Sequence, residues 1–153
     1  MRRVRYIFDF SDQVMLSIFK LGGHEGSLPE LATWFAREDA PDFVLCEDEN
    51  LARFLNGLII KNRGSKDGGI PEPESTLTNN LVLRKLKIAL NLQTDDLIKI
   101  IKLNNFNLSK HELSALFRRP DHKNYRVCLD QVLRNFLDGM GKHYRAQDNG
   151  TPS

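Results

Sequence analysis

Cysteine is scarce in this sequence, and a long apolar run is missing altogether. Two cysteines in 153 residues are too few for a disulfide scaffold and favour a reduced compartment. No stretch approaches the roughly 18 consecutive apolar residues of a membrane span. Asp9 and Asp12 follow the charged start, where a signal peptide would carry its apolar segment. We therefore expect a cytoplasmic protein with no membrane partner.

Motifs of known catalytic chemistry are also missing. The sequence contains no phosphate-binding loop, no nucleophile elbow and no HExxH pattern for zinc. Its four histidines share no ligand spacing with each other or with the cysteines. We therefore expect no enzymatic activity, no metal site and no cofactor. A hydrolytic site that follows no motif is the alternative.

An internal repeat is the strongest pattern present. A shift of 82 positions overlays residues 3–63 on residues 85–145 without a gap, and identical pairs occur throughout. Glycine, proline and charged residues between the copies indicate a linker. We therefore divide the chain into a first repeat at residues 1–64, a linker at 65–78, a second repeat at 79–145 and a frayed polar tail at 146–153.

Each repeat shows four helical segments and no alternating strand pattern, which predicts an all-α fold. Each third helix opens on a capping box, Ser27 with Glu30 and Ser109 with Glu112. We expect the fourth helices to open near Cys46 and Cys128, with each cysteine as a possible N-cap, and the first helix of the second repeat to be capped by Asn79 and Asn80. The first helix of the first repeat lacks that cap and should be shorter.

The two repeats should pack against each other as a pseudo-twofold pair. A unit of about 60 residues is near the lower limit for an independent core. Gly57 and Gly139 lie at matched positions inside the fourth helices, where a glycine costs about 1 kcal/mol relative to alanine. We expect both to allow the close approach of another element, and the contact between the copies is the first candidate.

Four sequence strings resemble the bacterial YehS-like family. They are FLNGLI at residues 54–59, LRKLKIALNL at 83–92, LSALFR at 113–118 and PDHKNYR at 120–126. The resemblance extends from residue 2 to about residue 145. It implies a small, duplicated, cytoplasmic domain of unknown function, with no catalytic residue to carry over. Members begin with a few more residues, including an asparagine pair, ahead of the arginine-rich start.

The charge of the chain is unevenly distributed. The net charge is only +2 overall, but residues 1–64 carry −2 and residues 77–153 carry +6. The positive excess is concentrated between the third and fourth helices of the second repeat, where arginine and lysine could hold phosphates and a tyrosine could stack on a base. These residues are the predicted nucleic-acid-binding site for DNA or RNA: Arg118, Arg119, His122, Lys123, Tyr125 and Arg126. The same stretch of the first repeat is acidic, with Glu38, Asp39 and Asp42.

Three other interpretations remain open from the residues alone. The second and third helices, residues 95–117, could form a helix-turn-helix, although an ordinary helical hairpin is favoured because their connection is long. A protein-interaction adaptor or homodimer would use an apolar groove near Trp34 and Phe43. A thiol-dependent sensor or enzyme would use Cys46 or Cys128, although a small buried side chain is favoured at both positions.

Overall fold

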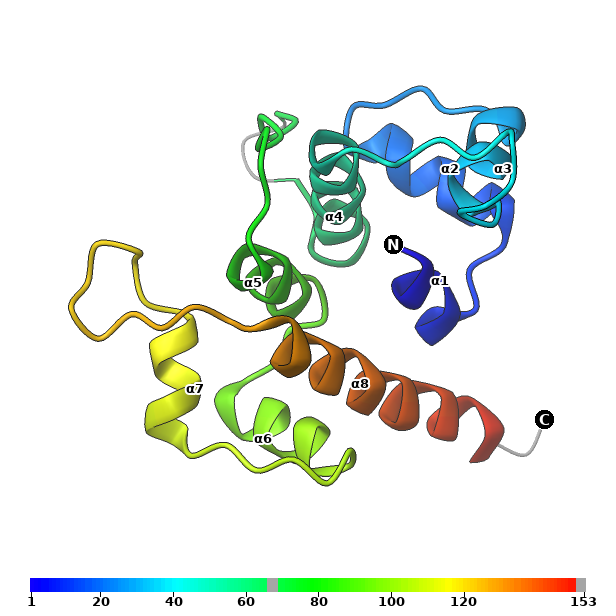
Figure 1. The fold of residues 1–153 in the computed structure, drawn as a ribbon. Helices are drawn as coiled ribbons and strands as arrows, with labels where there is room; N and C mark the ends of the chain where they lie inside the picture. Colours follow the sequence, from blue (N-terminus) through cyan, green and yellow to red (C-terminus); the bar gives the residue numbers. More distant parts are fainter. Residues whose placement is uncertain (66–68, 151–153) are drawn as a thin grey trace.

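The computed structural model describes residues 1–65 and 69–150, and the side chains among them up to residue 145. These residues form eight helices and no strand, four helices in each repeat, which confirms the all-α prediction (Figure 1). The helices are α1 (Arg2–Phe8), α2 (Asp12–Leu21), α3 (Leu28–Phe35), α4 (Asp48–Arg63), α5 (Asn79–Ala89), α6 (Thr94–Lys102), α7 (Lys110–Leu116) and α8 (Asp130–Gly150). Helix α8 runs through residues 146–150 of the predicted frayed tail, and the end of that tail, residues 151–153, lies outside the described residues.

The first helix of each repeat packs against the last helix of the other repeat. In Figure 1, α1 lies beside α8 and α5 lies beside α4, whereas α2 packs on α4 and α6 packs on α8 within their own repeats. These contacts are matched one for one between the repeats, as a pseudo-twofold pair requires. The exchange joins the two repeats in one continuous core.

Short-range features of the two repeats also match. Asp9 and Asn91 end the first helices with φ angles of 52° and 53°. Gly23 and Asn105 follow the second helices, also at positive φ. Helix α1 has 7 residues and α5 has 11, which confirms that the first helix of the first repeat is the shorter one.

The predicted caps of three helices are wrong. Thr78 is the N-cap of α5 and accepts a hydrogen bond from the Leu81 amide at 3.1 Å, so Asn79 and Asn80 lie inside the first turn. Helix α4 begins at Asp48 with Glu47 as its N-cap, and α8 begins at Asp130. Each cysteine therefore precedes its helix, because a thiol is a weak acceptor and makes a poor cap.

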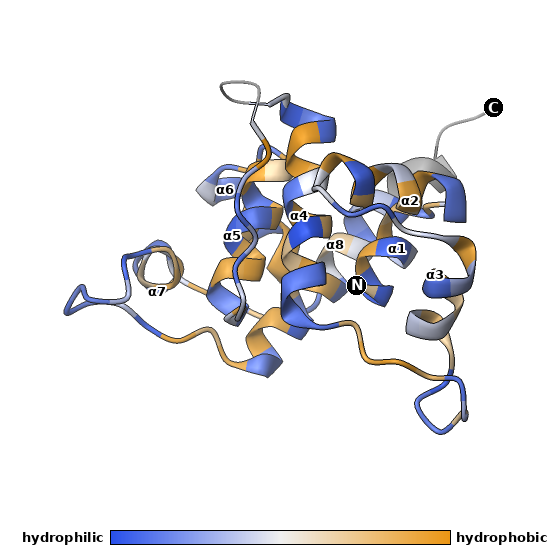
Figure 2. Ribbon diagram, turned by 90° about the horizontal axis from the view of Figure 1, so that it is seen from above, coloured by the Kyte–Doolittle hydropathy of each residue, from blue (hydrophilic) through white to orange (hydrophobic). Residues whose placement is uncertain are grey.

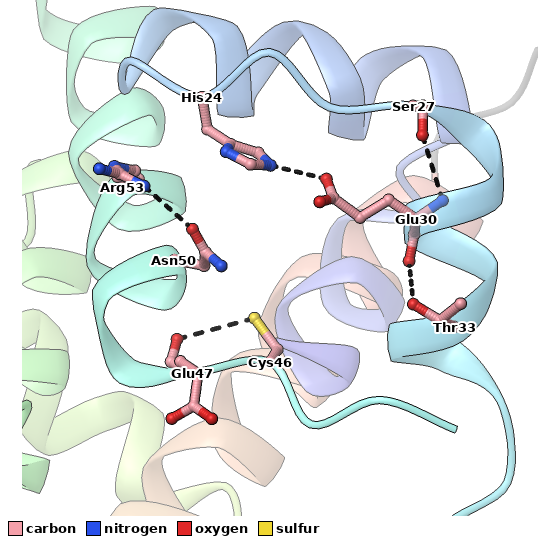
Figure 3. A network of polar contacts seen from close by, with 8 residues as sticks. All are labelled: His24, Ser27, Glu30, Thr33, Cys46, Glu47, Asn50 and Arg53. Atoms are coloured by element: carbon pink, nitrogen blue, oxygen red, sulfur yellow. Dashed lines mark hydrogen bonds and ion pairs between the residues drawn. The ribbon is translucent and has the colours of Figure 1, made fainter. Parts of the chain in front are cut away.

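Only one of the two predicted capping boxes is complete. Ser109 and Glu112 bond reciprocally, each at 3.1 Å. Ser27 accepts from the Glu30 amide at 3.2 Å, but the Glu30 carboxylate instead contacts His24 Nε2 at 2.6 Å (Figure 3). The position that matches His24 in the second repeat is a phenylalanine, which leaves the glutamate there free to complete the box.

The matched glycines allow two helices to touch within each repeat. A Cβ atom at Gly57 would lie 1.9 Å from the Ile18 carbonyl oxygen, and one at Gly139 would lie 2.2 Å from the Ile100 carbonyl oxygen. The predicted close approach is confirmed. The neighbour is the second helix of the same repeat, so the expected contact between copies at these glycines is wrong.

Two loops with hydrophilic tips and hydrophobic arms leading into the next helix project from opposite ends of the molecule. Figure 2 shows the connection between α3 and α4 at one end and the connection between α7 and α8 at the other. We call these the α3–α4 loop (residues 36–47) and the α7–α8 loop (residues 117–129). No helix in the described part of the chain combines the length and apolar character that crossing a membrane requires.

Candidate nucleic-acid interface

The α7–α8 loop carries all six residues of the predicted nucleic-acid site, from Arg118, its second residue, to Arg126. Its backbone has a defined path, because three main-chain hydrogen bonds of 2.9 to 3.0 Å fold it: His122 to Arg119, Tyr125 to His122 and Arg126 to Ala115. The α3–α4 loop has the same three bonds at matched positions: Ala40 to Arg37, Phe43 to Ala40 and Val44 to Thr33. The two loops therefore share the same turn hydrogen bonds, but the α3–α4 loop is acidic and the α7–α8 loop is basic.

Asn80 anchors the base of the α7–α8 loop. Its side chain is 7% exposed and donates to the carbonyl oxygens of Leu116 and Arg126, both at 2.9 Å. It also accepts from the Cys128 amide at 2.9 Å. One buried amide thus holds three backbone groups on both sides of the loop.

The six predicted residues divide into an exposed group and a half-buried pair. Arg119, His122, Lys123 and Arg126 are exposed. Arg119 pairs with Asp121 at 3.5 Å, but both side chains are at least 75% exposed, so water screens this ion pair and the guanidinium remains accessible to a phosphate. Arg118 and Tyr125 are half-buried.

The half-buried pair lines a small cavity of about 130 Å³, together with Arg84 of α5. The Nε atom of Arg118 is buried and meets no acceptor among the described residues. Two guanidinium groups and a phenol ring therefore border one cavity. Arg84 was missed by the sequence interpretation, because nothing in the local pattern shows that α5 lies beside the loop.

The thiols show no sign of activation. Burial raises the pKa of Cys46 and of Cys128 from 9.0 to about 11. Each Sγ atom has only a distant backbone contact, Cys46 to the Glu47 oxygen at 3.9 Å (Figure 3) and Cys128 to the Leu129 oxygen at 3.8 Å. A raised thiol pKa lowers the thiolate fraction, so the geometry favours the structural interpretation of both cysteines.

The structure also bears on the interpretations of a docking groove, a helix-turn-helix and a metal site. Trp34 is 6% exposed and packs on Phe19 with ring centroids 5.2 Å apart, so a docking groove lined by this tryptophan is wrong. Helix α7 has 7 residues, and a seven-residue connection separates it from α6, which agrees with an ordinary helical hairpin. The described residues hold no group of three His, Cys, Asp or Glu side chains that could bind a metal.

Comparison with known proteins places the sequence among related chains. A family model described as "Protein of unknown function (DUF1456)" matches residues 1–64 and 79–146. The chain is 44% identical over 142 residues to a protein of Escherichia coli (strain K12) named "Uncharacterized protein YehS". That alignment covers 92% of this chain and 90% of the relative. No solved structure matches the chain.

Proposed function

This chain belongs to the DUF1456 family of proteins of unknown function, and we propose that it is a non-enzymatic binding module that takes DNA or RNA through its α7–α8 loop. The six residues of the site keep the roles assigned above: Arg118, Arg119, His122, Lys123 and Arg126 face the phosphates, and Tyr125 offers a ring on which a base can stack. Arg84 joins them through the shared cavity.

The observation that carries this proposal is the pair of equivalent loops with opposite charge. Both loops have the same turn hydrogen bonds, so the basic residues are not needed to fold the second one. The first repeat places Glu38, Asp39 and Asp42 in the corresponding stretch. A positive charge that the fold does not require, on a defined backbone, supports a role in holding an anionic partner.

Single-stranded nucleic acid fits the loop better than a duplex groove. Helix α7, which leads into the loop, has only 7 residues, which offers little length to lie along a major groove. A loop with exposed cations and one accessible ring matches the combination by which single strands are bound. We therefore expect short single-stranded DNA or RNA to bind more tightly than a duplex of the same sequence.

The experiment compares the wild-type chain with Arg118→Ala/Arg119→Ala by fluorescence anisotropy, using short mixed-sequence DNA and RNA probes at low and physiological salt. We expect salt-sensitive binding and a loss of about tenfold or more in the double variant. Arg37→Ala is the matched control, because Arg37 occupies the place of Arg119 in the acidic loop and pairs with Asp39 at 3.3 Å. A thermal melt of each variant separates lost binding from lost folding.

Two results would contradict the proposal. One is the absence of binding to any probe even at low salt, and the other is undiminished binding by the folded double variant. Either result would favour the alternative of a protein-interaction adaptor or homodimer, which pull-down and sedimentation experiments would then examine.

A further inference from the structure

A second basic surface lies between α1 and α8, outside the proposed nucleic-acid interface. It borders an open hollow of about 900 Å³, which we call the α1–α8 groove. Its lining includes four cationic side chains, from Arg2, Arg3, Lys142 and Arg145, and one carboxylate, from Asp138. Ile7, Leu137 and Gly141 add an apolar part to the same lining. A volume of this size suits a small organic ligand.

The cationic side chains of the groove are held in place by bonds to the protein. Lys142 donates to the carbonyl oxygen of Leu103 at 3.3 Å and to Asn104 Oδ1 at 2.9 Å. Arg145 donates to the Tyr6 carbonyl oxygen at 2.6 Å, and its guanidinium lies 4.1 Å from the centre of the Tyr6 ring.

The two arginines of α1 that line the groove are also held. Arg2 donates to the Ala36 carbonyl oxygen, and Arg3 pairs with Asp138. Each arginine has five N–H donors, so these contacts leave further donors for a ligand. Side chains already fixed in position lose less entropy when an anion binds.

The internal repeat provides a built-in comparison for the groove. The matching contact, between α5 and α4, carries Ile59 and Ile60 where the groove has Gly141 and Lys142, and Asn56 where it has Asp138. Its lysine, Lys85, pairs with Glu74 of the linker at 3.0 Å and donates to Asn56 Oδ1 at 2.6 Å. Three of the groove's four cations have basic counterparts there, since Arg84, Lys85 and Arg63 match Arg2, Arg3 and Arg145. The groove therefore differs from its counterpart at Asp138, Gly141 and Lys142.

We propose that the α1–α8 groove is a binding site for a small phosphorylated ligand, with the phosphate groups held by Arg2, Arg3, Lys142 and Arg145. Paired guanidinium groups match the geometry of phosphate oxygens, and one carboxylate does not neutralise four cations. The apolar lining would receive the non-phosphate part of the ligand. The groove lies along residues 137–145 of α8, about 12 to 24 Å from the end of the α7–α8 loop at 1.5 Å per helical residue, so this site does not depend on the proposed function.

The test uses isothermal titration calorimetry on the full chain with ATP and pyrophosphate as probes. We expect both probes to bind, and to bind more weakly as salt is added. Gly141→Ile/Lys142→Ile gives the groove the residues that the first repeat has at the matched positions and should weaken binding by about tenfold or more. Arg118→Ala/Arg119→Ala is the matched control, and it should bind both probes as the wild type does.

Lys142→Ala keeps the test decisive if the double isoleucine variant does not fold, because Lys142 is exposed and its loss leaves the core intact. Lys142→Ala should also weaken the binding of ATP and of pyrophosphate. The proposal is overturned if neither probe binds at millimolar concentration, if folded groove variants bind as the wild type does, or if only an oligonucleotide binds. These results are independent of the Arg118/Arg119 experiment, so failure of one site is distinguishable from failure of the other.

Discussion

Two glycines of α8, two positions apart, have different surroundings. A Cβ at Gly139 would lie 2.2 Å from the Ile100 carbonyl oxygen, which belongs to the backbone of α6 and cannot move away alone. A Cβ at Gly141 would meet only Ile7 Cγ1 at 3.8 Å, an ordinary van der Waals contact. Packing therefore explains the glycine at position 139, whereas at position 141 the missing side chain keeps the α1–α8 groove open.

The two alanine variants should accordingly move stability in opposite directions. Gly139→Ala forces α6 and α8 apart and should lower the free energy of unfolding by about 1–3 kcal/mol. Gly141→Ala removes a helix-breaking residue without a clash and should raise it by about 0.5–1 kcal/mol. Urea denaturation of both variants measures these changes, and equal changes of the same sign would refute this account of the glycines.

The reactivity of the two cysteines should depend on pH. Burial raises the pKa of both thiols from 9.0 to about 11. At neutral pH the folded protein should therefore react with a thiol reagent about 100-fold more slowly than free cysteine, because two pKa units change the thiolate fraction by that factor. The rate should climb as the pH rises toward 11.

The same shift has a consequence for stability. The folded state favours the neutral thiol, so this stabilisation is complete below pH 9 and is lost as the pH rises through about 11. Reaction rates measured in buffer and in urea, where the unfolded chain serves as the control, test the raised pKa of the two thiols. A folded-state rate equal to that of free cysteine would return the thiol-dependent interpretation to consideration.

At the scale of the elements, the sequence predicts correctly a helix cap whose hydrogen-bond partners lie within one turn of the chain. The capping box of Ser109 and Glu112 depends on four consecutive residues, and the sequence predicted it correctly. Glu30 and Asn80 behave differently, because their partners lie outside the capped turn: His24, six residues earlier, takes the first, and the distant α7–α8 loop takes the second. The sequence pattern does not show contacts of this kind, so it predicts a capping role for both Glu30 and Asn80.

Asn80 offers the sharpest test of an element's dependence on one side chain. Asn80→Ala would leave the Leu116 and Arg126 carbonyls and the Cys128 amide without their present partner, which should cost about 2–3 kcal/mol of stability. Amides of the α7–α8 loop should exchange hydrogen faster. Asn107→Ala, at an exposed position of the α6–α7 connection, is the matched control. Unchanged exchange in the loop would show that Asn80 does not anchor it.

At the scale of the whole molecule, the exchange of first helices is the feature that the sequence could not supply. The 82-residue offset establishes two copies, but it is the same whether each first helix packs in its own repeat or in the other. The α1–α8 groove and the place of Arg84 beside the loop both follow from tertiary packing, which explains why the sequence predicted the basic loop and missed these residues.

The exchange also predicts that the repeats unfold together. Trp34 belongs to the first repeat and is buried there, so its fluorescence reports on that half. Gly139→Ala damages only the second repeat, yet it should shift the fluorescence transition of Trp34 as far as the transition seen by circular dichroism. A Trp34 transition that stays at the wild-type midpoint would indicate that the repeats are independent.

The central claim is that the α7–α8 loop binds nucleic acid through its basic residues, and the most direct measurement is the salt dependence of single-strand binding. The logarithm of the binding constant should fall linearly with the logarithm of salt concentration, and Arg118→Ala/Arg119→Ala should reduce that slope by about 1.4, or roughly 0.7 for each lost phosphate contact. Arg37→Ala should leave the slope unchanged. Equal slopes for the wild type and the double variant would contradict the assignment of this surface.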